Sequence, residues 1–148
     1  MDYVERGWSL IEDFYRWLLD KNFSLFQSGI YCKYIATFFD LFMKKFFYGE
    51  VDLKDISKEI LREYLGYWYP MNATFASVDD IKMQIESFKM FCEFLERIKN
   101  AKMDMAFLFL ENEDRIVNRF KSYMKIKRDC IDFSKFEEDL KEWLMEEW

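Results

Sequence analysis

The sequence predicts an all-α protein, with five or six helices packed into a single orthogonal bundle. Only four glycines and one proline occur among the 148 residues, so the chain has few of the residues that a hairpin-rich sheet protein needs at its turns. Apolar residues recur at spacings of three and four, as they do on one face of a helix. The length fits one domain, and a composition that is 51% hydrophobic and 21% aromatic provides a core for it.

Apolar spacing places the first helix at about residues 8–21 and the second at about residues 25–48. The second helix has a broad apolar stripe, which is typical of a central helix that is contacted on several sides. The stripe consists of Ile30, Tyr34, Ile35, Phe38, Phe39, Phe42, Phe46 and Phe47. Gly49 follows this helix and suits a left-handed cap.

Capping residues define the next two helices. Ser57 is the expected N-cap of the third helix, and Pro70 is expected to stop it. Residues 70–77 are the clearest loop in the chain. Ser77 and Asp80 then form a capping-box pattern, with Asp in place of Glu, at the start of the fourth helix.

The rest of the chain is expected to be helical too. The fourth helix ends near Lys99, and residues 101–127 form either one long helix or two, because a polar stretch interrupts their helical spacing. Ser134 and Glu137 make an S-x-x-E capping box for the last helix. The chain contains no internal repeat or low-complexity linker, so residues 1–148 are expected to form one domain.

The absence of histidine removes most catalytic arrangements from consideration. No Ser-His-Asp or Cys-His site can form, and no HExxH zinc motif is present. The sequence also lacks the glycine-rich motifs GxGxxG and GxxxxGK[ST] that bind phosphates of cofactors. We therefore expect a non-catalytic protein with no metal, cofactor or small-molecule substrate.

The three cysteines and the lack of long apolar stretches indicate in which cellular compartment the protein is expected. Cys32, Cys92 and Cys130 form no CxxC pair, and the first two lie in apolar helical segments, where a thiol behaves as a small hydrophobic group. We expect all three to be structural thiols in a reducing compartment. No leader pattern or apolar run of about 20 residues is present, so we expect a cytoplasmic protein that does not contact a membrane.

Charge is distributed unevenly along a chain whose net charge is −6 and whose pI is near 4.9. The segment 115–128 contains six basic residues and no acidic residue. The basic residues are Arg115, Arg119, Lys121, Lys125, Lys127 and Arg128. Residues 129–148, in contrast, carry eight acidic residues against two lysines. The basic segment is therefore either a strip that binds phosphate groups or a helix that the acidic segment neutralises within the fold.

Two other patterns also have two interpretations. Trp143, Leu144 and Trp148 indicate that the last helix either docks on the core or forms an interface with a partner or a second copy. Glu59 and Glu63 share a helical face and could contact a cation, although such pairs are more typical of a solvated surface.

Four stretches between residues 9 and 99 follow one another in a characteristic order and spacing. They are FYRWLLDKNFS (14–24), SGIYCKYIATFFDLF (28–42), DLKDISKEILREYL (52–65) and SVDDIKMQIESFKMFCEFL (77–95). This order resembles the N-terminal, SAM-like core-binding domain of tyrosine recombinases of the phage-integrase family. The resemblance implies a four-helix core at residues 9–99, with residues 101–148 as helices that pack on it. It does not include the catalytic domain, because no H-x-x-R box is present.

The resemblance implies a non-catalytic module that binds duplex DNA. The expected phosphate contacts are Lys33, Lys82, Lys89, Arg115, Arg119, Lys121, Lys125 and Arg128. The alternative is a protein-interaction or homo-oligomerisation module with no nucleic-acid role, in which Trp143, Leu144 and Trp148 form the interface.

Overall fold

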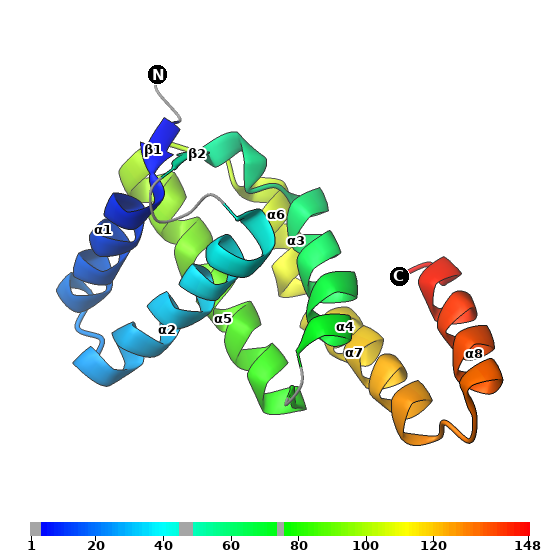
Figure 1. Ribbon diagram of the computed structural model, residues 1–148. Coiled ribbons are helices and arrows are strands. Elements are labelled where there is room, and N and C mark those ends of the chain that lie inside the picture. The colour runs from blue at the N-terminus through cyan, green and yellow to red at the C-terminus, as the bar shows by residue number, and fades with distance from the viewer. Residues whose placement is uncertain (1–3, 45–48, 74–75) are drawn as a thin grey trace.

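The computed structural model describes residues 4–44, 49–73 and 76–148, and these residues form a helical bundle (Figure 1). The helical segments are α1 (Gly7–Asp20), α2 (Leu25–Thr37) with a π-helical extension (Phe38–Met43), α3 (Lys58–Glu63) joined by a π-helical turn (Tyr64–Trp68) to α4 (Tyr69–Asn72), α5 (Val78–Lys99), α6 (Asp104–Glu111), α7 (Glu113–Arg128) and α8 (Phe133–Met145). The all-α prediction is confirmed. The described residues contain seven continuous helices, where five or six were expected.

A small antiparallel ribbon closes one end of the bundle. β1 (Val4–Arg6) pairs with β2 (Glu50–Asp52), with Arg6 opposite Glu50, and a 3₁₀ turn (Leu53–Asp55) follows. The sequence prediction contained no strand here, because three residues are too few to show the alternation that marks a strand.

The core is built around α5, which packs against α1 and α2 on one side and against α6 and α7 on the other (Figure 1). Phe88 of α5 meets the ring of Phe38 at 5.1 Å, and Phe38 meets Tyr64 at 4.9 Å. Phe91, one turn further along α5, meets Phe14 of α1 at 5.0 Å. These five rings are fully buried, and their edge-to-face geometry adds to the stabilisation that comes from burial alone.

Two predicted helix starts are confirmed by their capping hydrogen bonds. The Ser57 hydroxyl accepts a hydrogen bond from the Ile60 backbone N–H at 3.2 Å. The Ser77 hydroxyl accepts one from the Asp80 backbone N–H, also at 3.2 Å. The Asp80 carboxylate accepts a hydrogen bond from the Tyr34 hydroxyl at 2.9 Å, so it ties the start of α5 to α2.

The prediction that Pro70 stops the third helix is wrong. The chain stays helical from residue 58 to residue 72, with a π-helical turn just before the proline. A proline within a helix has no N–H to offer the carbonyl four residues earlier. That carbonyl belongs to Gly66, and it accepts a hydrogen bond from the Arg119 Nε at 3.1 Å. A side chain from another helix therefore supplies the donor that the proline lacks.

The second helix is shorter than predicted. It ends at Met43, and Lys44 takes the left-handed conformation that was predicted for Gly49, with φ of 59°. No described glycine has a positive φ. The last part of the predicted helix, residues 45–48, lies outside the described residues, as do residues 74–75 of the predicted loop.

The end of the chain also differs from the prediction. Residues 104–128 form two helices that meet at Asn112, which settles the alternative that the sequence left open. The capping box at Ser134 is wrong, because the N-cap of α8 is Asp132, whose carboxylate accepts a hydrogen bond from the Lys135 backbone N–H at 2.8 Å. Both residues are good caps, and the chain uses the one that starts the helix two residues earlier.

The three thiols are free and differ in exposure. Cys32 and Cys92 are buried, whereas Cys130 is exposed. Burial raises the pKa of Cys32 to about 12 and that of Cys92 to about 12, and Glu96 adds to the effect at Cys92. The two buried thiols are therefore protonated near neutral pH.

We expect Ellman's reagent to modify only Cys130 in the folded protein at about pH 8, because the reaction requires an accessible thiolate. The released chromophore should correspond to one thiol in buffer and to all three in guanidinium chloride. A Cys130→Ser variant, as a control, should release almost none when folded. Fast modification of a second thiol in the native protein would contradict the burial of Cys32 and Cys92.

Candidate functional site

The predicted basic strip lies on α7, but its side chains face different surroundings. Arg115 lines a pocket between α3 and α7. Arg119 is buried, with only 3% of its surface exposed, and Lys125 lines a groove between α7 and α8. Lys121 and Arg128 are exposed. Burial therefore removes Arg119 from the surface of the strip, whereas Arg115, Lys121, Lys125 and Arg128 stay exposed.

The acidic helix α8 lies beside α7 and compensates part of its charge (Figure 1). The groove that contains Lys125 is also lined by the carboxylates of Asp129, Asp139, Glu142 and Glu146. Arg128 pairs with Asp129, with 3.2 Å between Nε and Oδ1. The arrangement favours neutralisation within the fold at Lys125 and Arg128.

The other predicted phosphate contacts are on a different part of the bundle. Lys33 is exposed on α2, Lys82 is exposed on α5, and Lys89 is half-buried on α5. None of the three forms an ion pair with a residue that the structure describes. Their role in binding DNA stays a prediction.

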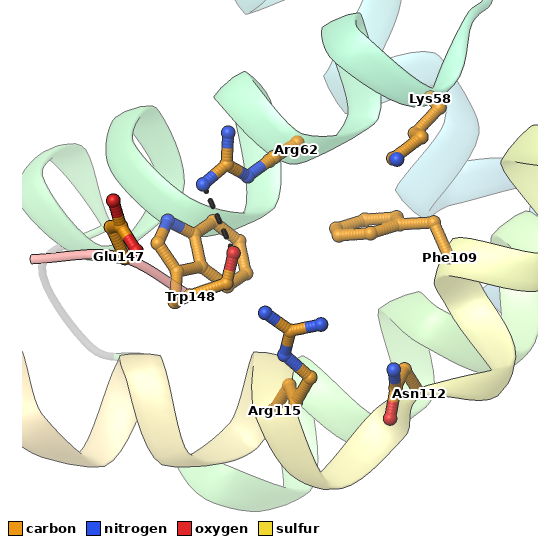
Figure 2. Close-up of a pocket in the computed structure, with 7 residues that line it drawn as sticks. All are labelled: Lys58, Arg62, Phe109, Asn112, Arg115, Glu147 and Trp148. Atoms are coloured by element: carbon orange, nitrogen blue, oxygen red, sulfur yellow. Dashed lines mark hydrogen bonds between the residues drawn. The ribbon is translucent and has the colours of Figure 1, made fainter.

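A pocket of about 720 Å³ lies where the start of α3, the corner between α6 and α7, and Trp148 come together (Figure 2). Its walls are formed by Lys58, Arg62, Phe109, Asn112, Arg115, Glu147 and Trp148. Figure 2 shows that the charged ends of Lys58 and Arg115 point toward the hollow, beside the ring of Phe109. The lining side chains include three cations and one carboxylate, a formal net charge of +2.

Helical spacing explains how the chain places these groups. Lys58 and Arg62 are four residues apart at the start of α3, so they share one face. Phe109 is in the last turn of α6, and Arg115 is in the first turn of α7, just after Asn112. The contact between α3 and α6 brings these segments together.

The sequence prediction missed Lys58 and Arg62. It considered the spacing of four on this helix only for Glu59 and Glu63, which are both exposed. The same spacing describes the basic pair, but the sequence does not show that this face of α3 lies opposite α7. Within the described residues, no group of three or more Cys, Asp or Glu side chains could hold a metal ion.

The cations of the pocket lack carboxylate partners in the part of the chain that the structure describes. Lys58 and Arg115 form no ion pair with any residue in the described ranges. The Arg62 Nη2 donates a hydrogen bond to the main-chain carbonyl of Trp148 at 3.0 Å, and its guanidinium lies 5.1 Å from the Trp148 ring centre. A concave site with uncompensated positive charge attracts anions.

Arg119 holds the elements behind the pocket together. Its Nε donates to the Gly66 carbonyl at 3.1 Å, and its Nη1 donates to the Trp143 carbonyl. The guanidinium lies 3.6 Å from the Trp143 ring centre and 4.6 Å from that of Tyr67. In return, the Trp143 Nε1 donates to the Arg119 carbonyl at 3.2 Å. The prediction that Arg119 contacts phosphate is wrong, because its side chain is enclosed by protein.

Burial dominates the electrostatics of Arg119. It lowers the pKa of the guanidinium below its usual value, and the charge of Arg62 lowers it further, while Tyr67 and Glu146 act in the opposite direction. The Glu146 Oε2 is 4.0 Å from the Arg119 Nη1. An arginine side chain keeps its proton in such surroundings, so a permanent positive charge sits among α7, α8 and the α3–α4 helix.

The aromatic residues near the end of the chain pack within the bundle. Trp143 is 2% exposed, so it is not available as an interface residue. Trp148 is half-buried and meets Phe109 at 5.9 Å and Tyr67 at 6.2 Å, ring centre to ring centre. Leu144 is exposed, so it is the most accessible of the three predicted interface residues.

Comparisons of the chain with family models, with curated proteins and with solved structures found no match. None of the described helices is both long enough and apolar enough to span a membrane. The interpretation of the pocket therefore depends on its own geometry and charge.

The position of Trp148 depends on the absence of a side chain at Gly66, because a Cβ there would overlap the Trp148 ring. We expect Gly66→Ala to lower the free energy of unfolding by about 1–3 kcal/mol, the usual cost of overpacking. Urea unfolding measures this loss, and hydrogen exchange should show faster opening of α8. In a Trp148→Ala background, the same change should no longer destabilise.

Gly29→Ala is the matched control for Gly66→Ala. Gly29 lies inside α2, where an added Cβ would meet no neighbouring heavy atom within 4 Å, so alanine should stabilise the helix by about 0.5–1 kcal/mol. If both substitutions changed stability equally, the close approach of Trp148 to Gly66 would be ruled out.

Proposed function

We propose that this chain is a non-catalytic module that binds duplex DNA through its phosphate groups, with the pocket between α3 and α7 at the centre of the contact surface. One observation carries the proposal. Lys58 and Arg62 of α3 and Arg115 of α7 line one pocket, and none of the three forms an ion pair with an Asp or Glu side chain of the described residues. Unpaired cations that share a surface provide the phosphate contacts that account for most nucleic-acid affinity.

Further basic residues lie next to this pocket. Lys58 also lines a second hollow, together with Lys54 and Lys102. Two carboxylates, Glu59 and Asp104, line the same hollow, so its excess positive charge is small. The second hollow extends the basic surface beyond the three central cations and gives a duplex more than one point of contact.

The resemblance to recombinase core-binding domains supports DNA as the partner and points to another surface. Of the eight predicted phosphate contacts, three lie within residues 9–99, the part that the resemblance covers: Lys33 on α2, and Lys82 and Lys89 on α5, whereas the pocket cations are on α3 and α7. The two surfaces make separate predictions, because substitutions on one leave the other unchanged.

We expect a mixed-sequence duplex to bind at low salt, with fluorescence anisotropy as the readout. With three phosphate contacts, affinity should fall about 40-fold when salt rises from about 50 mM to about 200 mM. A Lys58→Gln, Arg115→Gln double variant should reduce both the affinity and the slope of its salt dependence. Arg16→Gln, which removes an exposed cation of α1, should change neither.

A Lys33→Gln, Lys82→Gln variant tests the surface that the resemblance implies. Loss of affinity in this variant alone would move the contact to α2 and α5 and would remove the pocket from the proposal. Absence of any duplex binding at low salt would end the DNA proposal altogether.

A second candidate function is self-association through α8. Large apolar side chains are exposed at both ends of this helix, with exposed fractions of 87% for Ile131, 76% for Phe133 and 84% for Met145. Exposed apolar groups that lie close together are typical of interaction surfaces. Leu144, next to Met145, is part of the predicted interface that stays accessible.

If α8 mediates self-association, light scattering after size-exclusion chromatography should give a mass above that of one chain, and the mass should rise with concentration. Ile131→Ser with Phe133→Ser, or Leu144→Ser with Met145→Ser, should restore a monomer. Leu25→Ser on α2, which is also exposed, is the control. A monomer at every concentration would contradict this candidate.

A further inference from the structure

The three cations of the pocket surround the hollow from different sides. In Figure 2, Lys58 and Arg62 approach it from α3, and Arg115 approaches it from α7, across the hollow. Asn112, at the corner before α7, adds an amide that can donate hydrogen bonds. A small anion in the hollow could therefore be bound by donors from both helices at once.

The charge of the pocket distinguishes between kinds of phosphate. The net charge of the lining side chains is +2. A phosphate inside a nucleic-acid strand carries a single negative charge, whereas a terminal phosphate monoester carries about −1.5 to −2 at neutral pH. A monoester compensates the pocket more fully than an internal phosphate does.

The pocket has room and apolar surface for more than a phosphate. Its volume of about 720 Å³ is within the usual range for sites that hold organic ligands. The ring of Phe109 forms one wall, and its centre is 5.9 Å from the ring centre of Trp148. Aromatic side chains beside phosphate-binding cations are typical of sites that stack a base.

Arg62 is held in place without any ligand. Its hydrogen bond to the Trp148 carbonyl and its position over the Trp148 ring fix the guanidinium, and Trp148 itself fits against Gly66. A cation that is already positioned loses little conformational entropy when an anion arrives. The structure therefore provides a partly preorganised site.

From these observations we infer that the pocket formed by Lys58, Arg62 and Arg115 binds a phosphate monoester that is attached to a planar ring, the chemistry of a 5′-mononucleotide. The inference deepens the proposed function, since it rests on the same pocket. The phosphate can come from two sources, a free mononucleotide or the 5′-phosphorylated end of a polynucleotide.

Calorimetric titration with adenosine 5′-monophosphate (AMP) tests the inference, with adenosine and inorganic phosphate as separate titrants. We expect AMP to bind at least about tenfold more tightly than adenosine, because charge-assisted hydrogen bonds to the phosphate are lost in the nucleoside. Backbone amide signals of residues 109–116 should shift in NMR spectra when AMP is added. Equal affinity for AMP and adenosine, or no AMP binding at millimolar concentration, overturns the inference.

Two pocket variants separate the contributions of the phosphate and the ring. Arg115→Gln should weaken AMP binding by about 10- to 100-fold, whereas the exposed α1 variant Arg16→Gln should leave it within about twofold. Phe109→Leu should weaken AMP binding but leave inorganic phosphate binding unchanged. Arg115 is exposed, so its variant should stay folded, and its circular dichroism and melting temperature check this. An Arg115→Gln variant that binds AMP normally places the phosphate elsewhere and overturns the inference.

Competition against AMP identifies the source. Displacement by a 5′-phosphorylated oligonucleotide, and not by the same oligonucleotide with a 5′-hydroxyl, supports the end of a strand as the ligand. Displacement by neither supports a free mononucleotide. If AMP binds in a way that depends on Arg115 and no duplex binds, the inference is supported and the proposed function is rejected. If a duplex binds but AMP does not, the inference is rejected and the proposed function is kept.

Discussion

The buried guanidinium of Arg119 is the interaction on which this end of the molecule depends. Burying a charge is unfavourable by several kcal/mol unless its hydrogen bonds are satisfied. Its Nε and Nη1 donate to the main-chain carbonyls of Gly66 and Trp143, and its Nη2 has no hydrogen-bond partner among the described residues. The Gly66 carbonyl lacks its usual helical donor because Pro70 follows four residues later, whereas the Trp143 carbonyl, in the last turn of α8, also accepts the Glu146 backbone N–H at 3.3 Å. Arg119 thus supplies donors to two helices, and the ring of Trp143 covers its charge at 3.6 Å.

The same interaction sets the positions of the pocket cations. Arg115 and Arg119 are four residues apart on one face of α7, and Lys58, Arg62 and Gly66 follow one another at the same spacing along the helix opposite. Once Arg119 is bonded to Gly66, the preceding turn of each helix brings Arg115 near Arg62. The pocket is therefore a geometric consequence of the contact between Arg119 and Gly66, one helical turn away.

Local patterns in the sequence predicted the helices and two of their caps, because amphipathic spacing and the hydroxyls of Ser57 and Ser77 act over a few residues. Pro70 misled the prediction, since the donor that lets the helix continue comes from a residue far along the chain. The basic pattern of α7 could not show that Arg119 is buried while Arg115 lines a pocket. Lys58 and Arg62 became recognisable only when the packing of α3 against α6, and of the following π-helical turn against α7, was known.

The distribution of acidic groups explains how an acidic chain keeps one basic site. Half of the acidic residues of segment 129–148 are on α8, where Asp139 and Glu142 line the groove with Lys125 and Glu137 pairs with Lys141. Only Glu147 of that segment reaches the pocket. At physiological salt, electrostatic interactions between exposed charges decay over about 8 Å, so a ligand in the pocket is influenced mainly by the lining residues. The net charge of −6 therefore opposes non-specific contact with polyanions at a distance, while the pocket attracts an anion that fits it.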